Sequence, residues 1–189
     1  ATSRSGKACA TAARCSRAAC TRSSRPGSRW RGSRRVAGRT ASRTTTSATH
    51  GTGLAVAPAG DVNGDGYADL VIGAYTYDGD QWDEGQAYVY YGAPSGLSAS
   101  PPWMAEGNQV GAVFGHSVGT AGDVNGDGYS DVIVGADSYD NGQTDEGRAY
   151  VYHGASTGLS TSAGWTAEGD QDDARFGCSV GTAGDVNGD

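Results

Sequence analysis

The chain of 189 residues has little with which to fill a large hydrophobic core, since it contains 2 Phe and 1 Met and 37% of its residues are hydrophobic. No apolar run approaches the roughly 18 residues that a membrane-spanning helix needs, so we expect no membrane span in this chain. A sustained helical period of apolar residues is also missing, which argues against a helix bundle. The 32 Gly and 10 Tyr favour a turn-rich β protein instead.

Acidic residues are missing from the first part of the chain. Residues 1–50 hold 12 of the 14 Lys and Arg and none of the 21 Asp and Glu, whereas residues 51–189 hold 2 basic and 21 acidic side chains, a net charge of −19. The basic Arg/Ser-rich segment has almost nothing to bury and shows no apolar core of a secretion signal, so we expect it to be disordered. A nucleic-acid-binding arm is the alternative. The acidic remainder should not bind nucleic acid.

The chain has 4 Cys, and their spacing suggests neither a disulfide framework nor a metal site. Cys9, Cys15 and Cys20 are separated by five and four residues, which no zinc pattern uses, and the nearest His is His50. Cys178 is alone in the acidic region. Cysteine therefore does not indicate the redox compartment, and the role of the first three is left open.

A repeat of 62 residues organises the acidic region. Residues 61–67 read DVNGDGY, the same letters recur at 123–129, and DVNGD begins again at residue 185. When residues 52–113 are set over residues 114–175 without gaps, 36 of the 62 positions are identical. Fixed spacing of this kind indicates repeated structural units. The domain division that we predict is a tail (1–50) followed by repeat 1 (52–113), repeat 2 (114–175) and a truncated repeat 3 (176–189), all three within residues 51–189.

Within one repeat the apolar segments are short and separated by Gly, Asp and Ser. In repeat 2 the candidate strands are residues 114–119, 131–135, 148–153 and 165–168. The second of these is a continuous apolar run, which is typical of a strand buried on both faces. Four strands per repeat are typical of a β-propeller blade. The predicted fold class is therefore all-β: a partial β-propeller of about two and a quarter blades, each with four antiparallel strands.

The repeated acidic segment follows the pattern D-x-N-x-D-G-x-x-D. Oxygen-bearing side chains at alternate positions of a tight loop turn inward, and carboxylates crowded in this way need a cation. Oxygen ligands without His or Cys select Ca²⁺ over transition metals. We predict calcium ligands at these positions, with each Tyr offering its backbone carbonyl: Asp61, Asn63, Asp65, Tyr67 and Asp69; Asp123, Asn125, Asp127, Tyr129 and Asp131; and Asp185, Asn187 and Asp189.

Two other interpretations of this loop fit less well. An EF-hand needs a Glu at position 12 and a helix on each side, but position 12 is Ile72 or Val134, inside a strand-like run. A polar turn without metal stays open, although two complete copies in register favour the metal. A site with a Kd of about 10⁻⁵ M fills at about 10⁻³ M Ca²⁺ and stays nearly empty in cytosol. We therefore expect a structural ion and an extracellular setting.

These residues resemble the FG-GAP repeat family, the blades of integrin alpha-subunit β-propellers and their bacterial relatives. The resemblance rests on residues 114–115, the loop 123–131 and residues 135–136, and covers about residues 51–189. It implies a propeller of about seven blades, with calcium in loops on one face and ligands on the other. Such a chain is a fragment of a ring. The sequence departs from the family at three positions: Thr52 replaces its Phe, and Tyr75 and Asp137 replace the Pro of its Gly-Ala-Pro element.

Two motifs resemble catalytic ones without predicting a catalytic residue. Residues 115–119 and 177–181 match Gly-x-Ser-x-Gly, but a nucleophile elbow needs a strand-to-helix turn, so we expect Ser117 to be an ordinary strand residue. His116 and His153 have no recurring partner, so we expect them to be strand side chains as well.

Glu and Trp residues recur between the repeats. Glu84 and Glu146 recur with Glu106 and Glu168, a pairing that glycosidases use, but repetition in every copy favours solvated loop charge. Trp103 and Trp165 recur, which favours packing between blades, while Trp82 lies in a predicted loop and is the better candidate for ligand contact.

The predicted function is that of a non-catalytic, calcium-binding propeller segment serving extracellular recognition or cell adhesion. Its expected partner is an unidentified protein or carbohydrate ligand at the cell surface, and its expected location is extracellular. The alternative is an accessory propeller of a secreted hydrolase, phospholipase D-like or polysaccharide-degrading, whose catalytic domain lies outside these residues. A third interpretation is a repeat fragment without a function of its own.

Overall fold

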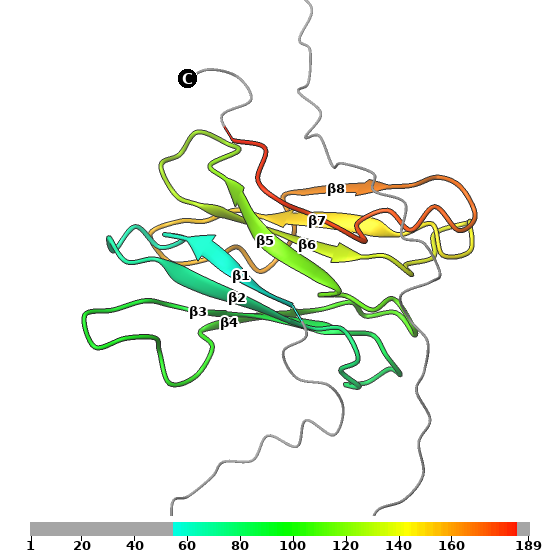
Figure 1. Ribbon diagram of the computed structural model, residues 1–189, viewed down its shortest axis with the longest axis horizontal. Coiled ribbons are helices and arrows are strands. Elements are labelled where there is room, and N and C mark those ends of the chain that lie inside the picture. The colour runs from blue at the N-terminus through cyan, green and yellow to red at the C-terminus, as the bar shows by residue number, and fades with distance from the viewer. Residues whose placement is uncertain (1–54, 185–189) are drawn as a thin grey trace, which may run out of the picture.

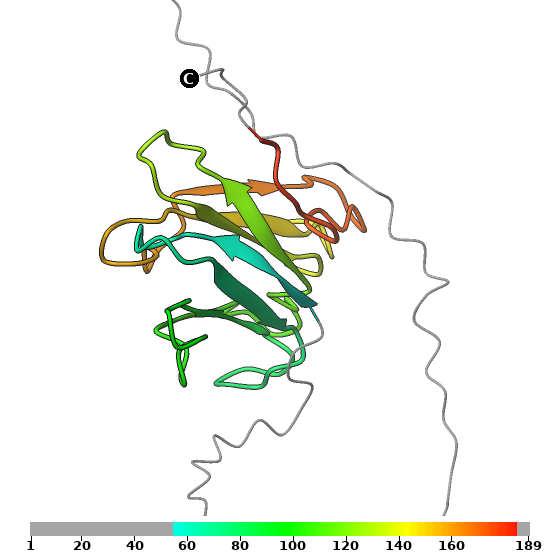
Figure 2. The same ribbon diagram turned by 60° about the vertical axis from the view of Figure 1, so that its left-hand side comes forward.

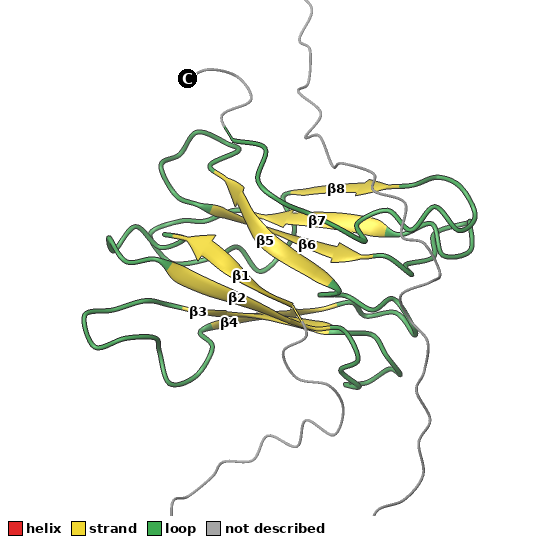
Figure 3. Ribbon diagram, viewed as in Figure 1, coloured by secondary structure: helices red, strands yellow, loops and turns green. Residues whose placement is uncertain are grey.

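The computed structural model describes residues 55–184, and every regular element in that range is a β-strand. Repeat 1 contributes β1 (Ala55–Gly60), β2 (Asp69–Ala74), β3 (Gln86–Tyr90) and β4 (Trp103–Glu106). Repeat 2 contributes β5 (Ser117–Gly122), β6 (Asp131–Ala136), β7 (Arg148–Tyr152) and β8 (Trp165–Glu168). Figure 3 shows these strands joined by long loops. The all-β fold class predicted from the sequence is confirmed.

Each repeat forms one four-stranded antiparallel sheet in which sequential strands are neighbours. The strand order is β1-β2-β3-β4 in the first sheet and β5-β6-β7-β8 in the second. The first strands of the two sheets, β1 and β5, make the closest approach between them (Figures 1 and 2). Sheets of this order that meet along their first strands are adjacent blades of a propeller. The described chain is therefore a partial β-propeller.

The main hydrophobic core lies between the two blades. It joins Val71 and Val89 of the first blade to Val132 and Val134 of the second, all of them fully buried. Trp103 belongs to the same core, and its indole Nε1 donates a hydrogen bond to the carbonyl of Ser160 in repeat 2 at 2.9 Å. Packing of Trp103 between blades, expected because it recurs, is thus confirmed. Neither blade buries this surface by itself, so the two stabilise each other.

A second, smaller cluster lies on the other face of blade 2. Neighbouring residues of a strand point to opposite faces, so Ile133 points away from blade 1 and packs with Ala121 and Val151, against the partly buried Val180 of repeat 3. With both faces covered, β6 is buried at all six positions, as its continuous apolar run predicted. In β2 burial is less complete, because no described residues cover the outer face of blade 1.

The connection between the blades passes through Phe114 and Gly115, which precede the strand instead of forming part of it. The Phe114 N–H donates to the carbonyl of Glu84 in blade 1 at 3.0 Å, and the Phe114 ring meets the edge of Tyr150 at 5.2 Å between centroids. The prediction of a strand from residue 114 was therefore wrong by three residues: β5 begins at Ser117, because Phe114 serves as an anchor on the preceding blade.

Several sequence predictions fall outside the described residues: the disordered segment 1–50 with Cys9, Cys15 and Cys20, the start of repeat 1, and the third acidic loop at Asp185, Asn187 and Asp189. Between residues 55 and 184 there is no helix long and apolar enough to cross a bilayer.

Candidate metal centre

The two complete acidic loops occupy equivalent places, one between β1 and β2 and the other between β5 and β6. They are also in contact. The Ser130 N–H, in the second loop, donates to the Asp61 carbonyl at 2.9 Å, and the Asp61 N–H donates back to the Ser130 hydroxyl at 3.2 Å. Both loops therefore lie at the same edge of the blades. This is the arrangement expected when a loop recurs at the same point of each blade.

The Asp61 carboxylate accepts hydrogen bonds from the backbone of the first loop. Its Oδ1 accepts from the N–H groups of Gly64 at 2.7 Å and Asp65 at 3.1 Å, and its Oδ2 accepts from Gly66 N–H at 2.8 Å. The chain thus wraps around one carboxylate. Glycine suits this turn at Gly66, where φ is +87°, because an L side chain rarely adopts that conformation.

The next two ligand candidates are linked to each other. The Asn63 Oδ1 accepts from Asp65 N–H at 3.1 Å, and the Asn63 amide nitrogen donates to Asp65 Oδ2 at 3.0 Å. Asp65 Oδ1 in turn accepts from Tyr67 N–H at 2.9 Å. Hydrogen bonds therefore link the side chains of Asn63 and Asp65 to each other and to the loop backbone. The exposed position of Asp65 leaves it open to solvent ions.

Asp69 closes the loop from the first residue of β2 and is buried. Its two oxygens accept from Val62 N–H and Gly92 N–H, each at 2.8 Å. Burial raises the pKa of Asp69, an effect that these two hydrogen bonds oppose and that repulsion by Asp65 and Asp61 reinforces. A cation bound in the loop would relieve this repulsion.

The second loop repeats this network almost bond for bond. The Asp123 carboxylate accepts from the N–H groups of Gly126, Asp127 and Gly128 at 2.8, 3.1 and 2.7 Å. The Asn125 Nδ2 donates to Asp127 Oδ2 at 2.8 Å. The Asp131 carboxylate accepts from the N–H groups of Val124 and Gly154 at 2.9 and 2.8 Å. Hydrogen bonds from the loop amides, led by that of Gly128, outweigh burial and lower the pKa of Asp123. One difference is His153, whose Nδ1 lies 3.3 Å from Asp131 Oδ2 where repeat 1 has Tyr91.

The donor set fits a hard divalent cation. Both loops offer carboxylate, amide and carbonyl oxygens with no sulfur, which is the chemistry that Ca²⁺ takes. Within residues 55–184 the three aspartates of each loop do not bring their carboxylate oxygens within 4.8 Å of one another as a group. An ion there would therefore also rely on the Asn side chains and the carbonyls of Tyr67 and Tyr129 to complete its coordination.

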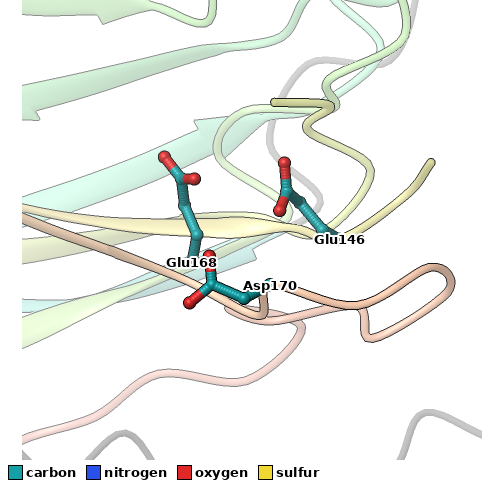
Figure 4. A group of neighbouring side chains, drawn as sticks. All are labelled: Glu146, Glu168 and Asp170. Carbon is teal, nitrogen blue, oxygen red and sulfur yellow. The ribbon is translucent and has the colours of Figure 1, made fainter. Parts of the chain in front are cut away.

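The structure corrects one prediction about the other acidic residues. Glu84 and Glu146 were expected to be solvated, but each is only 1% exposed, and each has one carboxylate oxygen without a hydrogen-bond partner. They lie directly before β3 and β7, where the following repeat covers them. Figure 4 shows Glu146 gathered with Glu168 and Asp170, whose oxygens lie within 4.8 Å of one another. Sequence reasoning missed this cluster because nothing in one copy indicates what the next copy covers.

The remaining candidates behave more simply. Ser117 opens β5 and its hydroxyl donates to the carbonyl of Gly177 at 2.6 Å, so it is a strand residue as expected. His116 and His153 flank strands instead of lying in them, and His116 Nδ1 is 3.4 Å from Asp137 Oδ1. Trp82 lies in a loop and is 74% exposed, so it stays available as a ligand contact.

Comparison with known proteins places this architecture in a class. The model of the FG-GAP repeat matches residues 52–90 and 114–152, one match in each blade. The chain is also similar to integrin alpha chains: it is 34% identical to integrin alpha-6 of Gallus gallus over 117 residues (61% of this chain), 39% identical to integrin alpha-6 of Homo sapiens over 102 residues (53%), and 34% identical to integrin alpha-7 of Rattus norvegicus over 130 residues (68%).

The two blades are thus those of an integrin alpha-like β-propeller, and the repeat region of this chain belongs to the FG-GAP repeat family. The resemblance noted in the sequence is confirmed. The matched segments cover 10%, 8% and 11% of the three integrin chains. The chain therefore spans about a tenth of the length of these relatives.

Proposed function

We propose that this chain is a calcium-binding segment of an FG-GAP propeller that serves extracellular recognition or adhesion. The observation that supports the proposal most strongly is the identity of the two acidic loops. Equivalent oxygens are positioned by equivalent backbone hydrogen bonds in both blades, at distances that agree within a few tenths of an ångström. A polar turn without a ligand gives no reason for three Asp and one Asn to stand at the same four positions in both loops.

The proposed role of the ion is structural. Ca²⁺ would supply positive charge that offsets repulsion within each loop, while Asp61, Asn63, Asp65 and Asp69, or their equivalents, would hold it. Asp69 and Asp131 connect each loop to the blade, since each is the first residue of a buried strand. At about 10⁻³ M Ca²⁺, a site with a Kd of about 10⁻⁵ M stabilises the fold by about 2.7 kcal/mol.

This dependence on free Ca²⁺ is also the reason for proposing an extracellular location. Sites of that affinity fill at extracellular Ca²⁺ concentrations and empty in cytosol. A protein or carbohydrate ligand would then bind elsewhere on the propeller, and the exposed Trp82 is the best available contact. We propose no catalytic residue in this segment. The accessory-propeller alternative stays a prediction, because it depends on a catalytic domain outside these 189 residues.

Isothermal titration calorimetry of the full chain with Ca²⁺ tests the proposal. We expect a binding heat in the wild type, and the part of that heat that comes from the two loops should be lost in the double variant Asp65→Ala with Asp127→Ala. Asp80→Ala is the matched control, because it removes an exposed carboxylate outside the loops, and its heat should equal that of the wild type. An undiminished heat in the double variant would place the ion elsewhere.

A further inference from the structure

Glu146 is a buried carboxylate, and one of its oxygens accepts no hydrogen bond. Its side chain is 1% exposed, and Oε1 has no hydrogen-bond partner. The equivalent Glu84 of repeat 1 is equally buried and has one unpartnered oxygen, Oε2. Buried charges in proteins are paired or bound to metal, because an isolated charge loses its hydration and is strongly destabilising. A ligand is therefore expected at this position.

Two further carboxylates converge on Glu146 in blade 2. Glu168 ends β8, Asp170 lies two residues beyond it, and one oxygen from each of the three lies within 4.8 Å of the other two. Figure 4 shows the three side chains meeting where β8 ends, with Glu146 reaching in from the loop before β7. A separation of this size suits a shared cation, since oxygens bound to one Ca²⁺ lie about 2.3–2.6 Å from the ion.

The charge balance also favours a divalent cation. Arg148 pairs with Glu168, and Asn141 Nδ2 donates to Glu168 Oε2 at 2.9 Å. Burial opposes ionisation of Glu168, but these hydrogen bonds and the Arg148 charge outweigh it and lower its pKa. With Glu168 neutralised by Arg148, two negative charges remain, on Glu146 and Asp170. One divalent ion would balance them.

We propose that Glu146, Glu168 and Asp170 form a further site for a hard divalent cation, separate from the acidic loops. The site lies at the junction with repeat 3, since the Phe176 N–H donates to the Glu146 backbone carbonyl at 2.9 Å. Asp170 belongs to the segment that leads from β8 to that contact. The bound ion would therefore fasten the start of the following blade to blade 2.

Repeat 1 provides the internal comparison. There Glu84 and Glu106 correspond to Glu146 and Glu168, but Asn108 stands in place of Asp170 and Gln86 in place of Arg148. Gln86 Nε2 donates to Glu106 Oε1 at 2.6 Å, so Gln takes over the contact that Arg148 makes. Within the described residues the three-carboxylate group occurs in repeat 2 alone, and the proposed site is accordingly unique to blade 2.

The comparison also supplies well-tolerated variants. Asn108 and Asp170 share the same φ of 53°, so Asp170→Asn should keep the local fold while removing one charge. In the full chain at millimolar Ca²⁺, we expect Asp170→Asn to bind one ion fewer than the wild type, because affinity at oxygen sites follows the charge of the ligands. Bound Ca²⁺ per chain is counted by equilibrium dialysis, with circular dichroism to confirm unchanged strand content.

Two more variants separate a cation site from a structural role. Glu146→Gln should also lose one ion, whereas Arg148→Gln should bind that ion more tightly, because it removes the competing positive charge and Gln already fits this contact in repeat 1. A merely structural cluster would lose stability in Arg148→Gln without any gain in Ca²⁺ affinity. Asp65→Ala with Asp127→Ala should leave the ion of Glu146 in place, so the site is tested independently of the loops.

Two results would overturn the proposal. One is equal Ca²⁺ stoichiometry and affinity in the wild type, Asp170→Asn and Arg148→Gln. The other is a crystal structure at millimolar Ca²⁺ in which water alone contacts Glu146 Oε1. Loss of one ion in Asp170→Asn, together with tighter binding in Arg148→Gln, supports it.

Discussion

At Gly73, a hydrogen atom occupies the place where any other residue would carry a Cβ. A Cβ built there would lie 1.9 Å from the carbonyl oxygen of Gly115 in the next blade, and one built on Gly135 would lie 1.9 Å from the carbonyl oxygen of Gly177. The Gly-Ala element of one repeat and the Phe-Gly element of the next are therefore in direct backbone contact. This contact gives both elements a physical reason to recur together.

We expect Gly73→Ala to destabilise the chain by about 1–3 kcal/mol or more, because the added methyl group overlaps backbone that cannot move aside without separating the blades. Gly119→Ala is the matched control, since the nearest atom to its Cβ would be 3.8 Å away. Urea unfolding at fixed Ca²⁺ measures both. Equal stability of the two variants would contradict the role assigned to Gly73.

Burial of Tyr150 limits the stability of the fold at high pH. Burial raises the pKa of Tyr150 to about 12, although Arg148 offsets part of the effect, and burial raises that of Tyr88 to about 12 as well. The unfolded chain ionises these phenols near pH 10 while the folded chain keeps them neutral, so stability is full below pH 10 and falls as the pH rises towards 12.

We therefore expect Tyr150→Phe to raise the pH midpoint of alkaline unfolding, because it removes one group that favours the unfolded state at high pH. Tyr67→Phe, at a more exposed position, serves as the control and should leave the midpoint unchanged. Circular dichroism along a pH titration gives both midpoints. A lower midpoint in Tyr150→Phe would show that its hydroxyl contributes more in the folded state than its ionisation removes.

The burial of Glu84 and Glu146 was missed in the sequence for one reason. Glu84 and Glu146 look like loop charges, because each lies in a polar stretch beside Gly and Asp. Their burial comes from the following repeat: the Phe114 N–H donates to the Glu84 carbonyl, and the Phe176 N–H donates to the Glu146 carbonyl. A contact between consecutive repeats cannot be read from the pattern of one repeat. The local turn of the acidic loop is easier to predict, because the hydrogen bonds that the Asp61 carboxylate accepts come from Gly64, Asp65 and Gly66, a few residues away.

At the scale of elements, the sequence predicted two strands of repeat 2 closely. The strand predicted at 165–168 is β8 as observed, and 131–135 extends by one residue in β6. The prediction at 114–119 was less accurate. Gly115 has a φ of 83° and its N–H donates to the carbonyl of Gly135 at 3.0 Å, so the chain turns there before β5 begins.

Phe114, just before β5, attaches the second blade to the first. It is fully buried, with ring contacts to Tyr150 and Tyr152. We expect Phe114→Ala to cost about 3–5 kcal/mol, as is usual for a buried Phe. Phe176 is more exposed and lies at the equivalent position of repeat 3. Phe176→Ala should therefore lower the free energy of unfolding clearly less than Phe114→Ala. Chemical denaturation of both variants gives the comparison, and equal losses would contradict the difference in burial.

At the scale of the whole molecule, the division of the chain is itself a proposal. The charge boundary near residue 50 separates a basic segment from the acidic repeats. We expect deletion of residues 1–50 to leave the melting temperature and its Ca²⁺ dependence unchanged, because this basic segment has almost no apolar side chains to bury. Differential scanning calorimetry of the shortened and complete chains measures this. A large loss of stability on deletion would mean that the basic segment belongs to the fold.

The outer face of blade 1 leaves apolar side chains exposed that a neighbouring blade would cover. The face of blade 1 that carries Leu70 and Ile72 is partly exposed, whereas the corresponding face of blade 2 is covered by blade 1. Val56 and Met104 are likewise more than half exposed. In a closed ring each such face would meet another blade, so a propeller with more blades should be more stable than these two blades alone.

The central claim is that converging oxygens in two equivalent loops are held by a divalent ion. The most direct measurement is a crystal structure of the chain grown at millimolar Ca²⁺, with anomalous diffraction to locate the ion. We predict one anomalous peak in each complete loop, about 2.3–2.6 Å from oxygens of Asp61, Asn63, Asp65 and Asp69 and of their equivalents in repeat 2. Ordered loops without anomalous peaks at that Ca²⁺ concentration would contradict the claim.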